Sequence, residues 1–309
     1  MQVKRCGVPT ENHMQMNKKR IFALGFFDGV HLGHQALLRE CAQLAAEDGC
    51  EAAAITFDRH PRSLFMPTPP MLISTLPDRL RLLSSWGIQY TRVFPVTEET
   101  MSTPWQDFLD LLVADGAAGF VCGEDFRFGH RGEGNARNLE AYCRERGLPC
   151  LIVSQQTIGG IRISSTHIRR QIEEGDMATA VRFLGHPLTL TGTVVRGQQL
   201  GRTLGIPTAN LHLPEGLAVP RFGVYACRCL VDGDAYAAVA NVGTRPTVSG
   251  RGITVEPWIL DYSGDLYGRD ITLEFFRFLR PEQKFPDLSA LQAQIHADAA
   301  ETRAYLRCR

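Results

Sequence analysis

Two histidines three residues apart, His31 and His34, are the residues of this chain whose types and spacing most directly suggest chemistry. They lie in a glycine-rich segment, Gly25–His34 (GFFDGVHLGH), between the apolar run Arg20–Leu24 and a stretch rich in Ala, Leu and Glu, Gln35–Glu47. This pattern predicts a strand, a turn and a helix. Because the first N–H groups of a helix are unpaired and its dipole favours an anion, such a junction suits a phosphate. If both histidines are helical they share a face, and two imidazoles aimed at one point could stabilise charge on a reacting phosphate.

The elements around this segment alternate between strand and helix patterns from about residue 20 to 185. Apolar runs of strand length are Ala52–Phe57, Tyr90–Phe94, Gly119–Cys122 and Cys150–Val153. Helical patterns between them are Leu76–Trp86, Pro104–Val113 and Asn138–Arg146. Strands that alternate with helices predict a parallel sheet with helices on its faces, and ligands bind at the carboxyl ends of such strands. The histidine segment follows the end of the first strand, where a ligand is expected.

The character of the chain changes near residue 187. Short β-rich runs punctuated by Gly, Pro, Asn and Asp follow, which predicts an antiparallel barrel or sandwich. These runs are Gly192–Val195, Gly223–Val231, Ala235–Val239, Thr254–Leu260 and Ile271–Leu279. The last segment, from about Asp287 to Leu306, is amphipathic and predicts a closing helix.

Two further segments of the first half could bind an anion or a ring. Gly123–Gly129 (GEDFRFG) follows an apolar strand, and its aromatic and charged residues fit a binding loop or a structural turn with two anchoring aromatics equally well. Arg162–Arg169 (RISSTHIR) offers Ser164 or Ser165 as a helix N-cap, with hydroxyls and an arginine on the first turns. It is either a second anion cradle or a well-capped surface helix.

The second half carries one dense glycine-rich motif. Gly192–Gly197 and Gly201–Asn210 hold glycine far above its background, which suggests a backbone that approaches a ligand closely or a glycine-rich hairpin. Thr208 and Asn210 face one way on an extended strand, and their oxygens suit Mg²⁺. No Gly-Lys-[Ser/Thr] sequence occurs here, so the motif is not a Walker loop.

These motifs, in this order, resemble the bifunctional bacterial riboflavin kinase/FAD synthetase family. The resemblance implies an N-terminal Rossmann-like nucleotidyltransferase domain of the HIGH type and a C-terminal riboflavin kinase-like barrel. It implies phosphorylation of riboflavin to FMN by ATP, then adenylylation of FMN to FAD with release of pyrophosphate. Mg²⁺ is the implied metal. The HIGH-type histidines, His31 and His34, would stabilise the transition state of adenylyl transfer, and Glu256 would be the catalytic base of the kinase.

The family's other motifs imply further site residues. Nucleotide-binding residues would be Gly25, Phe27, Asp28, Gly33, Asp125, Arg162, Ser164, Ser165, Thr166, Arg169, Gly197, Gly201 and Gly205. Flavin-binding residues would be Phe126, Phe128, Pro207 and Arg245, and the metal ligands Thr208 and Asn210. Among these, Arg162 and Arg169 would hold the leaving pyrophosphate. The chain departs from the family pattern at Ile206, where phenylalanine is usual, and at Pro257-Trp258 beside Glu256.

Composition bounds the class of protein. With 309 residues, two domains are expected, at 20–186 and 187–309, after a flexible tail over 1–19. The 33 Lys and Arg balance the 33 Asp and Glu, which argues against a protein that mainly grips nucleic acid. No apolar run reaches the length of a membrane span, and residues 1–19 lack a signal-peptide core. The nine cysteines include no Cys-x-x-Cys pair, as is typical of free thiols in a reducing compartment. We therefore expect a cytoplasmic protein with neither a membrane nor a nucleic-acid partner.

Two alternatives stay open at this point. One is a flavin-binding regulatory protein without catalysis, which the intact His31, His34, Thr208, Asn210 and Glu256 disfavour. The other is a different HIGH-type enzyme, such as an aminoacyl-tRNA synthetase or a cytidylyltransferase. A tRNA partner calls for a basic recognition domain, and neither enzyme accounts for the Pro-Thr-Ala-Asn half.

Overall fold

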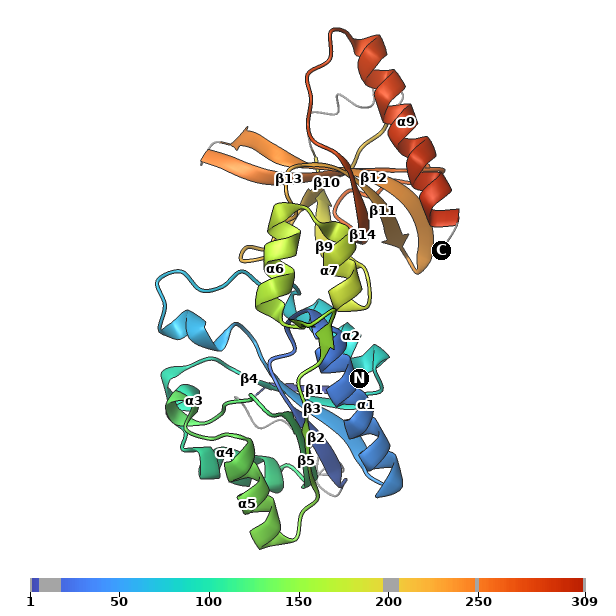
Figure 1. Cartoon of the computed structure of the whole chain (residues 1–309). Coiled ribbons are helices and arrows are strands. Elements are labelled where there is room, and N and C mark those ends of the chain that lie inside the picture. The colour runs from blue at the N-terminus through green and yellow to red at the C-terminus, as the bar shows by residue number, and fades with distance from the viewer. Residues whose placement is uncertain (1, 6–17, 197–205, 248–249, 308–309) are drawn as a thin grey trace. The chain divides into compact units, whose positions relative to one another are not determined.

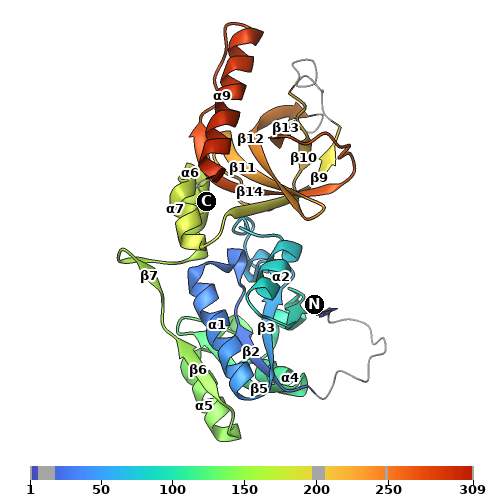
Figure 2. The same cartoon turned by 90° about the vertical axis from the view of Figure 1, so that its right-hand side faces the viewer.

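The chain folds into two compact units. The computed structural model describes residues 2–5, 18–196, 206–247 and 250–307 (Figures 1 and 2). One unit consists of Met1–Leu72 and Leu76–Ser164, and the other of Ile73–Thr75 and Ser165–Arg309. Each unit is described by itself below.

The first unit is built on a six-stranded parallel sheet. Its strand order is β1-β4-β3-β2-β5-β6, and every neighbouring pair is parallel. The strands are β1 (Gln2–Arg5), β2 (Arg20–Leu24), β3 (Glu51–Phe57), β4 (Tyr90–Phe94), β5 (Ala117–Gly123) and β6 (Cys150–Val153). The helices and 3-10 turns are η1 (Asp28–Val30), α1 (Leu32–Glu47), η2 (Pro61–Leu64), α2 (Leu76–Ser85), α3 (Glu98–Ser102), α4 (Trp105–Ala114), η3 (His130–Gly132) and α5 (Ala136–Arg146). A short hairpin, β7 (Thr157–Ile158) with β8 (Ile161–Arg162), follows the sheet.

Helices cover both faces of this sheet (Figure 1). Along β2, Phe22 and Leu24 pack into one apolar cluster with residues of α4 and α5. The alternate residues, Ile21 and Ala23, pack into a second cluster with residues of α1 and α2. A strand whose side chains alternate between two buried faces must be apolar throughout, which is why these strands read as unbroken apolar runs.

Strand β1 lies in the segment for which a flexible tail is expected. Residues Gln2–Arg5 pair in parallel with β4, from Gln2 opposite Tyr90 to Arg5 opposite Val93. The pairing satisfies backbone groups along the outer side of β4. Four polar and apolar residues in mixed order carry no strand pattern by themselves, so this edge strand could not be predicted from its residues.

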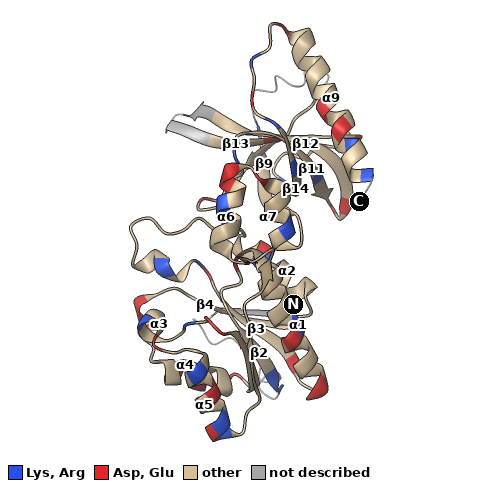
Figure 3. Ribbon diagram, viewed as in Figure 1, with Lys and Arg blue, Asp and Glu red and all other residues tan. Residues whose placement is uncertain are grey.

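The second unit is a closed antiparallel barrel, with three helices among its described residues. The barrel order is β10-β13-β12-β11-β14-β9. Its strands are β9 (Leu188–Val195), β10 (Asn210–His212), β11 (Gly223–Val231), β12 (Asp234–Thr247), β13 (Gly250–Ile259) and β14 (Asp270–Arg280). The helices are α6 (Ser165–Glu174), α7 (Met177–Leu184) and α9 (Leu288–Arg307). Charges of both signs are interspersed along α9 and, in the first unit, along α5 (Figure 3).

The closing helix α9 is tied to the barrel by apolar and charged contacts. Ala299 packs with Val224 and Val239 of the barrel. The carboxylate of Asp298, which is 3% exposed, accepts hydrogen bonds from Arg280 at the end of β14, at 2.8 to 3.1 Å. The parallel sheet, the barrel and the closing helix confirm the predicted fold class.

Helices α6 and α7 belong to the compact unit of the barrel. Helix α7 packs against β9 and β14, and the Arg221 N–H donates to the Ile172 carbonyl of α6 at 3.2 Å. The compact division therefore falls at Ser165, upstream of residue 187, where the character of the sequence changes.

Candidate active sites

The loop between β2 and α1 lies at the carboxyl end of a central strand and has a strained backbone. Phe27 and Val30 are non-glycine residues with φ of 59° and 38°. A β-branched residue such as Val30 rarely adopts this conformation. Both side chains are fully buried, and the packing around them holds the loop in this form. Strain of this kind is typical of ligand-binding and catalytic loops.

His31 and His34 stack against each other in this loop, but only one of them is helical. Their ring centroids are 3.6 Å apart and the rings are 11° from parallel. His31 is the N-cap of α1, with extended backbone, and its Nδ1 accepts a hydrogen bond from the backbone N–H of His34 at 3.3 Å. The condition for a shared helical face, that both residues are helical, is therefore not met by His31. The cap explains the difference, because an N-cap residue satisfies an N–H of the first turn from outside the helix.

The environment of His34 keeps its ring uncharged. Burial lowers its pKa well below the usual value, and the neighbouring His31 and Arg79 lower it further. Its Nδ1 is buried and has no hydrogen-bond partner among the described residues. The ring of His34 also contacts that of Phe27 in a T-shaped arrangement, with centroids 5.2 Å apart. A neutral imidazole whose buried nitrogen has no partner among the described residues is available to a ligand. Such groups are typical of catalytic sites.

The other predicted residues of this loop shape it rather than expose side chains. Asp28 is 1% exposed and Phe27 is fully buried. A Cβ on Gly25 would lie 2.8 Å from the ring of Phe27, and one on Gly33 would lie 3.3 Å from the ring of His31. These glycines leave room for the two rings that define the loop, and the roles of all four residues in nucleotide binding stay predictions.

Arg79 of α2 is a residue of this site that the sequence analysis missed. Its side chain is fully buried, and its Nη1 donates to the Thr56 hydroxyl at 3.0 Å and to the Phe57 carbonyl at 2.9 Å. Burial lowers its pKa to about 10, while Asp28 and Asp58 act in the opposite direction. The sequence does contain a sign that Arg79 is buried. Arg79 follows Leu76 by three residues and precedes Leu83 by four, which places it on the apolar face of the helix.

The structure brings two predicted nucleotide-binding residues of the first unit together. Asp125, in the loop after β5, forms an ion pair with Arg162 of β8. Both side chains are about half exposed, so they are accessible to a ligand. The predicted flavin contacts of this loop differ in exposure: Phe128 is 5% exposed within the apolar core, and Phe126 stacks on it at 5.8 Å. The burial of Phe128 agrees with its alternative reading as an anchor of the turn, and a flavin contact stays a prediction for both rings.

The serine-rich motif spans the division between the two units. Ser164 ends the first unit, and α6 begins at Ser165 in the second. Ser164 therefore immediately precedes the helix, where an N-cap is expected. Thr166 and Arg169 lie on the first turns of α6, and their roles in binding stay predictions.

In the barrel, strand register places the predicted metal ligands beside the predicted base. Leu211 of β10 is opposite Val255 of β13, and Thr208 forms a bridge with Trp258. Asn210 therefore lies opposite Glu256, and Thr208 points to the same face of the sheet. On the other side of β13, Glu256 is opposite Asn241 of β12. One carboxylate between two amides, with a hydroxyl nearby, forms a cluster of oxygen donors.

The unusual Pro257-Trp258 pair fits into this arrangement. The carbonyl of Pro257 accepts a hydrogen bond from the Ala209 N–H at 2.9 Å, so the strands stay paired although proline offers no N–H. Trp258 meets His296 of α9 edge to face at 5.6 Å. The pair thus connects the strand of Glu256 to β10 and to the closing helix.

A cavity of about 880 Å³ opens beside Thr208. Its lining includes Pro207 and Thr208, which were predicted, and residues which were not: Arg196, Tyr262, Asp265 and Tyr267. Arg196 lies 5.5 Å from the ring centre of Tyr267. The predicted Gly197, Gly201 and Gly205, and the side chain of Arg245, lie outside the described residues. Among the side chains that the structure describes, no three His, Cys, Asp or Glu form a metal cluster.

Comparisons with known families agree with both halves of the sequence reading. The family model for FAD synthetase matches residues 13–167, and that for riboflavin kinase matches residues 184–306. A bifunctional riboflavin kinase/FMN adenylyltransferase of Listeria monocytogenes is 36% identical, over 96% of this chain and 95% of the relative. The protein of the same name from Escherichia coli K12 is 38% identical, over 92% of each chain.

A solved structure covers both units. The crystal structure of a macrolide-efflux protein from Streptococcus pneumoniae is 31% identical to this chain, with a TM-score of 0.84. It covers 93% of this chain and 94% of its own. Within the described part of the present chain, no helix is long and apolar enough to cross a membrane.

Proposed function

The chain belongs to the family of bifunctional riboflavin kinase/FMN adenylyltransferases, and from this premise we propose which residues carry each reaction. The barrel unit phosphorylates riboflavin with ATP to give FMN and ADP. The unit with the parallel sheet joins FMN and ATP to give FAD and pyrophosphate. The observation that carries the assignment is the stacked pair of His31 and His34 at the start of α1, in a different compact unit from Glu256.

In adenylyl transfer, an oxygen of the FMN phosphate attacks the α-phosphorus of ATP, and pyrophosphate leaves. Such chemistry depends on alignment and on neutralising charge. His31 uses Nδ1 to accept the His34 N–H, so its neutral ring carries the proton on Nε2 and can donate to a phosphate oxygen. The free N–H groups of the first turn of α1 add positive potential at the same place. Arg162 holds the leaving pyrophosphate, and Asp125, its ion-pair partner, orients it.

In the kinase reaction, Glu256 takes the proton of the ribityl 5′-hydroxyl as that oxygen attacks the γ-phosphorus of ATP. The position of Glu256 opposite Asn210 supports this role, because strand register places the carboxylate beside a proposed metal ligand. The cavity beside Thr208 has the size of a small-molecule site and receives the nucleotide. Tyr262 and Tyr267 in its wall offer rings for a base.

The oxygen donors of Thr208 and Asn210 fit Mg²⁺. Both are hard ligands on one face of the sheet, and Mg²⁺ takes few protein ligands together with phosphates and water. When bound, the metal would neutralise charge on the transferring phosphate. A cytoplasmic location and the absence of a nucleic-acid partner stay predictions from composition.

A product profile tests the proposal. The purified protein is incubated with ATP and Mg²⁺ and with either riboflavin or FMN, and flavins are separated by chromatography. FMN and FAD from riboflavin, and FAD from FMN, are expected. The variant Glu256→Gln should abolish FMN formation from riboflavin while FAD still forms from FMN. A normal kinase rate in this variant would remove Glu256 from its role.

A further inference from the structure

The buried arginine of α2 connects three elements at the carboxyl edge of the parallel sheet. Arg79 donates to the Thr56 hydroxyl and the Phe57 carbonyl, both at the end of β3. Its guanidinium also lies 4.2 Å from the centre of the Phe26 ring, in the loop between β2 and α1. A planar cation that both donates hydrogen bonds and stacks on a ring fixes its neighbours in two directions.

A hydrogen-bond relay extends from this arginine into the histidine loop. Thr56 accepts from Arg79 and donates its hydroxyl proton to the Phe26 carbonyl at 2.8 Å. The ring of Phe26 meets the edge of His60 at 5.1 Å, so the same residue also touches the segment after β3. The start of the strained loop that carries His31 and His34 is therefore held against the end of β3.

The charge of Arg79 acts on the same loop. Its charge lowers the pKa of His34, after burial and the stacked His31 as the larger causes. The carboxylates near Arg79 are those of Asp28, in the loop itself, and Asp58, just beyond β3. The arginine thus compensates two carboxylates and disfavours a second positive charge at His34.

We propose that Arg79 is a positioning residue of the adenylyltransferase site, which fixes the Phe26–His34 loop against β3. Its charge adds to burial and to the neighbouring His31, the two larger causes that lower the pKa of His34. The inference rests on the proposed role of His31 and His34. Because Arg79 is fully buried, it acts through the loop and does not touch substrate.

Three variants separate the two parts of this role. Arg79→Met removes the charge and keeps the length of the apolar stem. Arg79→Lys keeps the charge and loses the planar fork. Thr56→Val removes the relay hydroxyl at nearly constant volume and leaves the charge in place. Arg20→Met is the matched control. Arg20 is a second buried arginine of this unit, 3% exposed, and it lies at the amino ends of the sheet strands, away from the histidine loop.

Each protein is assayed for FAD formation from FMN between about pH 5 and about pH 9, where a bell-shaped profile reports the essential groups. We expect Arg79→Met to lower kcat/KM by about 10- to 100-fold, the scale of a misplaced catalytic loop. Its loss should grow towards acid pH, since removing a neighbouring positive charge raises the pKa of His34. Arg79→Lys and Thr56→Val should lower kcat. Both keep the charge of residue 79, so the acidic side of the pH–rate profile should stay at the pH of the wild type.

Two results would overturn the proposal. One is an unchanged rate in Arg79→Met. The other is a loss by the same factor at every pH, accompanied by the same loss in Arg20→Met, which would mean that Arg79 only stabilises the fold. If Arg79→Met does not fold, Thr56→Val decides, and an unchanged kcat in that variant overturns the positioning role. FMN formation from riboflavin by the same preparations reports on the barrel, and FAD formation by the wild type tests the proposed function separately.

Discussion

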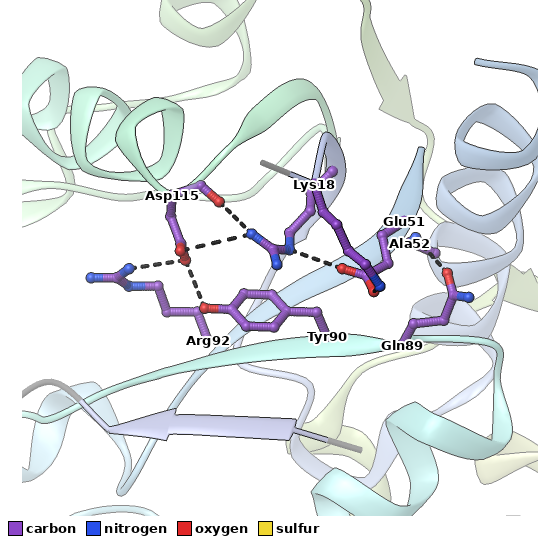
Figure 4. A network of polar contacts seen from close by, with 8 residues as sticks. Lys18, Glu51, Ala52, Gln89, Tyr90, Arg92 and Asp115 are labelled. Carbon is purple, nitrogen blue, oxygen red and sulfur yellow. Dashed lines mark hydrogen bonds and ion pairs between the residues drawn. The ribbon is translucent and has the colours of Figure 1, made fainter. Parts of the chain in front are cut away.

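The two edges of the parallel sheet each contain a buried arginine, but the surroundings of the two arginines differ. At the amino edge, Arg20 donates to Glu51 at 3.1 Å and to the Asp115 carbonyl at 2.7 Å, and it lies 4.1 Å from the centre of the Tyr90 ring. Lys18 and Arg92 complete the ion pairs of the two carboxylates, as Figure 4 shows. Every acid in this network has a base as partner.

At the carboxyl edge, the polar groups are less completely matched. The Nδ1 of His34 has no hydrogen-bond partner among the described residues, and the nearby backbone is strained at Phe27 and Val30. A satisfied network contributes to the stability of a unit, whereas an unsatisfied buried group costs free energy and marks a place where a ligand completes the bonding. The comparison teaches that buried charge alone does not locate the predicted site, where an unpartnered buried nitrogen and a strained backbone occur together.

The largest expected effect that separates the edges comes from His34→Ala. Loss of one group that stabilises transition-state charge lowers the rate by about 100- to 1,000-fold. We expect this loss in FAD formation from FMN, with FMN formation from riboflavin unchanged. The measurement is a steady-state rate for each half-reaction on one preparation. Equal losses in both half-reactions would refute the division between the units.

The reciprocal change at the amino edge is Arg20→Met, and its effect should be on stability. Removing one partner of a buried network leaves carboxylates under-compensated, which costs about 3 kcal/mol in the free energy of unfolding of the first unit. Urea unfolding followed by circular dichroism measures this loss. The rate of FAD formation well below the unfolding midpoint should be that of the wild type, and a large fall in that rate would remove the distinction between the edges.

A smaller effect is expected from Tyr90→Phe in the same network. The Tyr90 hydroxyl donates to Asp115 at 2.8 Å, and a hydrogen bond to a charged group contributes about 1.5 kcal/mol. Burial and this hydrogen bond raise the pKa of Tyr90 to about 12. Because the folded-state pKa lies above the unfolded value, this stabilisation is complete below about pH 10 and is lost as the pH rises towards the folded value. The variant should show a flatter alkaline decline in unfolding midpoint than the wild type does.

The smallest expected effect is the contribution of His34, at the carboxyl edge, to the loss of stability at acid pH. The folded-state pKa of His34 is lowered, so the unfolded chain binds a proton first as the pH falls. Stability is therefore complete above about pH 6.5 and declines below it. Replacing His34 by Gln should make the unfolding midpoint less sensitive to pH in this window. An identical slope in wild type and variant would show that other groups cause the acid decline.

Much of the fold could be predicted because the signal was local. Strands β2 and β4 begin and end at the predicted residues, and Asp287 caps α9 as expected, since its carboxylate accepts the Ala290 N–H at 2.8 Å. The predicted free thiols are also confirmed for the described cysteines, most of which are buried. Apolar runs bounded by turn residues carry this information within a few positions.

The rest depends on partners distant in the chain. The spacing of Arg79 from Leu76 and Leu83 places it on the apolar face of its helix, but its contacts with β3 and with the histidine loop depend on residues distant in the chain. The spacing of His31 and His34 fits a helical face and a capped helix start equally well. The juxtaposition of Asn210 and Glu256 follows from closure of the barrel, which no local pattern specifies.

Closure of the barrel also affects how chains associate. The barrel strands pair in a closed order, so none of them is an edge strand along its whole length, whereas the parallel sheet ends in β1 on one side and β6 on the other. Both edge strands have four residues, and short edges are poor templates for pairing. Although they are short, β1 and β6 are the edge strands of the sheet, so strand-to-strand aggregation in concentrated or heat-stressed solutions should begin in the nucleotidyltransferase unit. Charged residues introduced on β6 should suppress it.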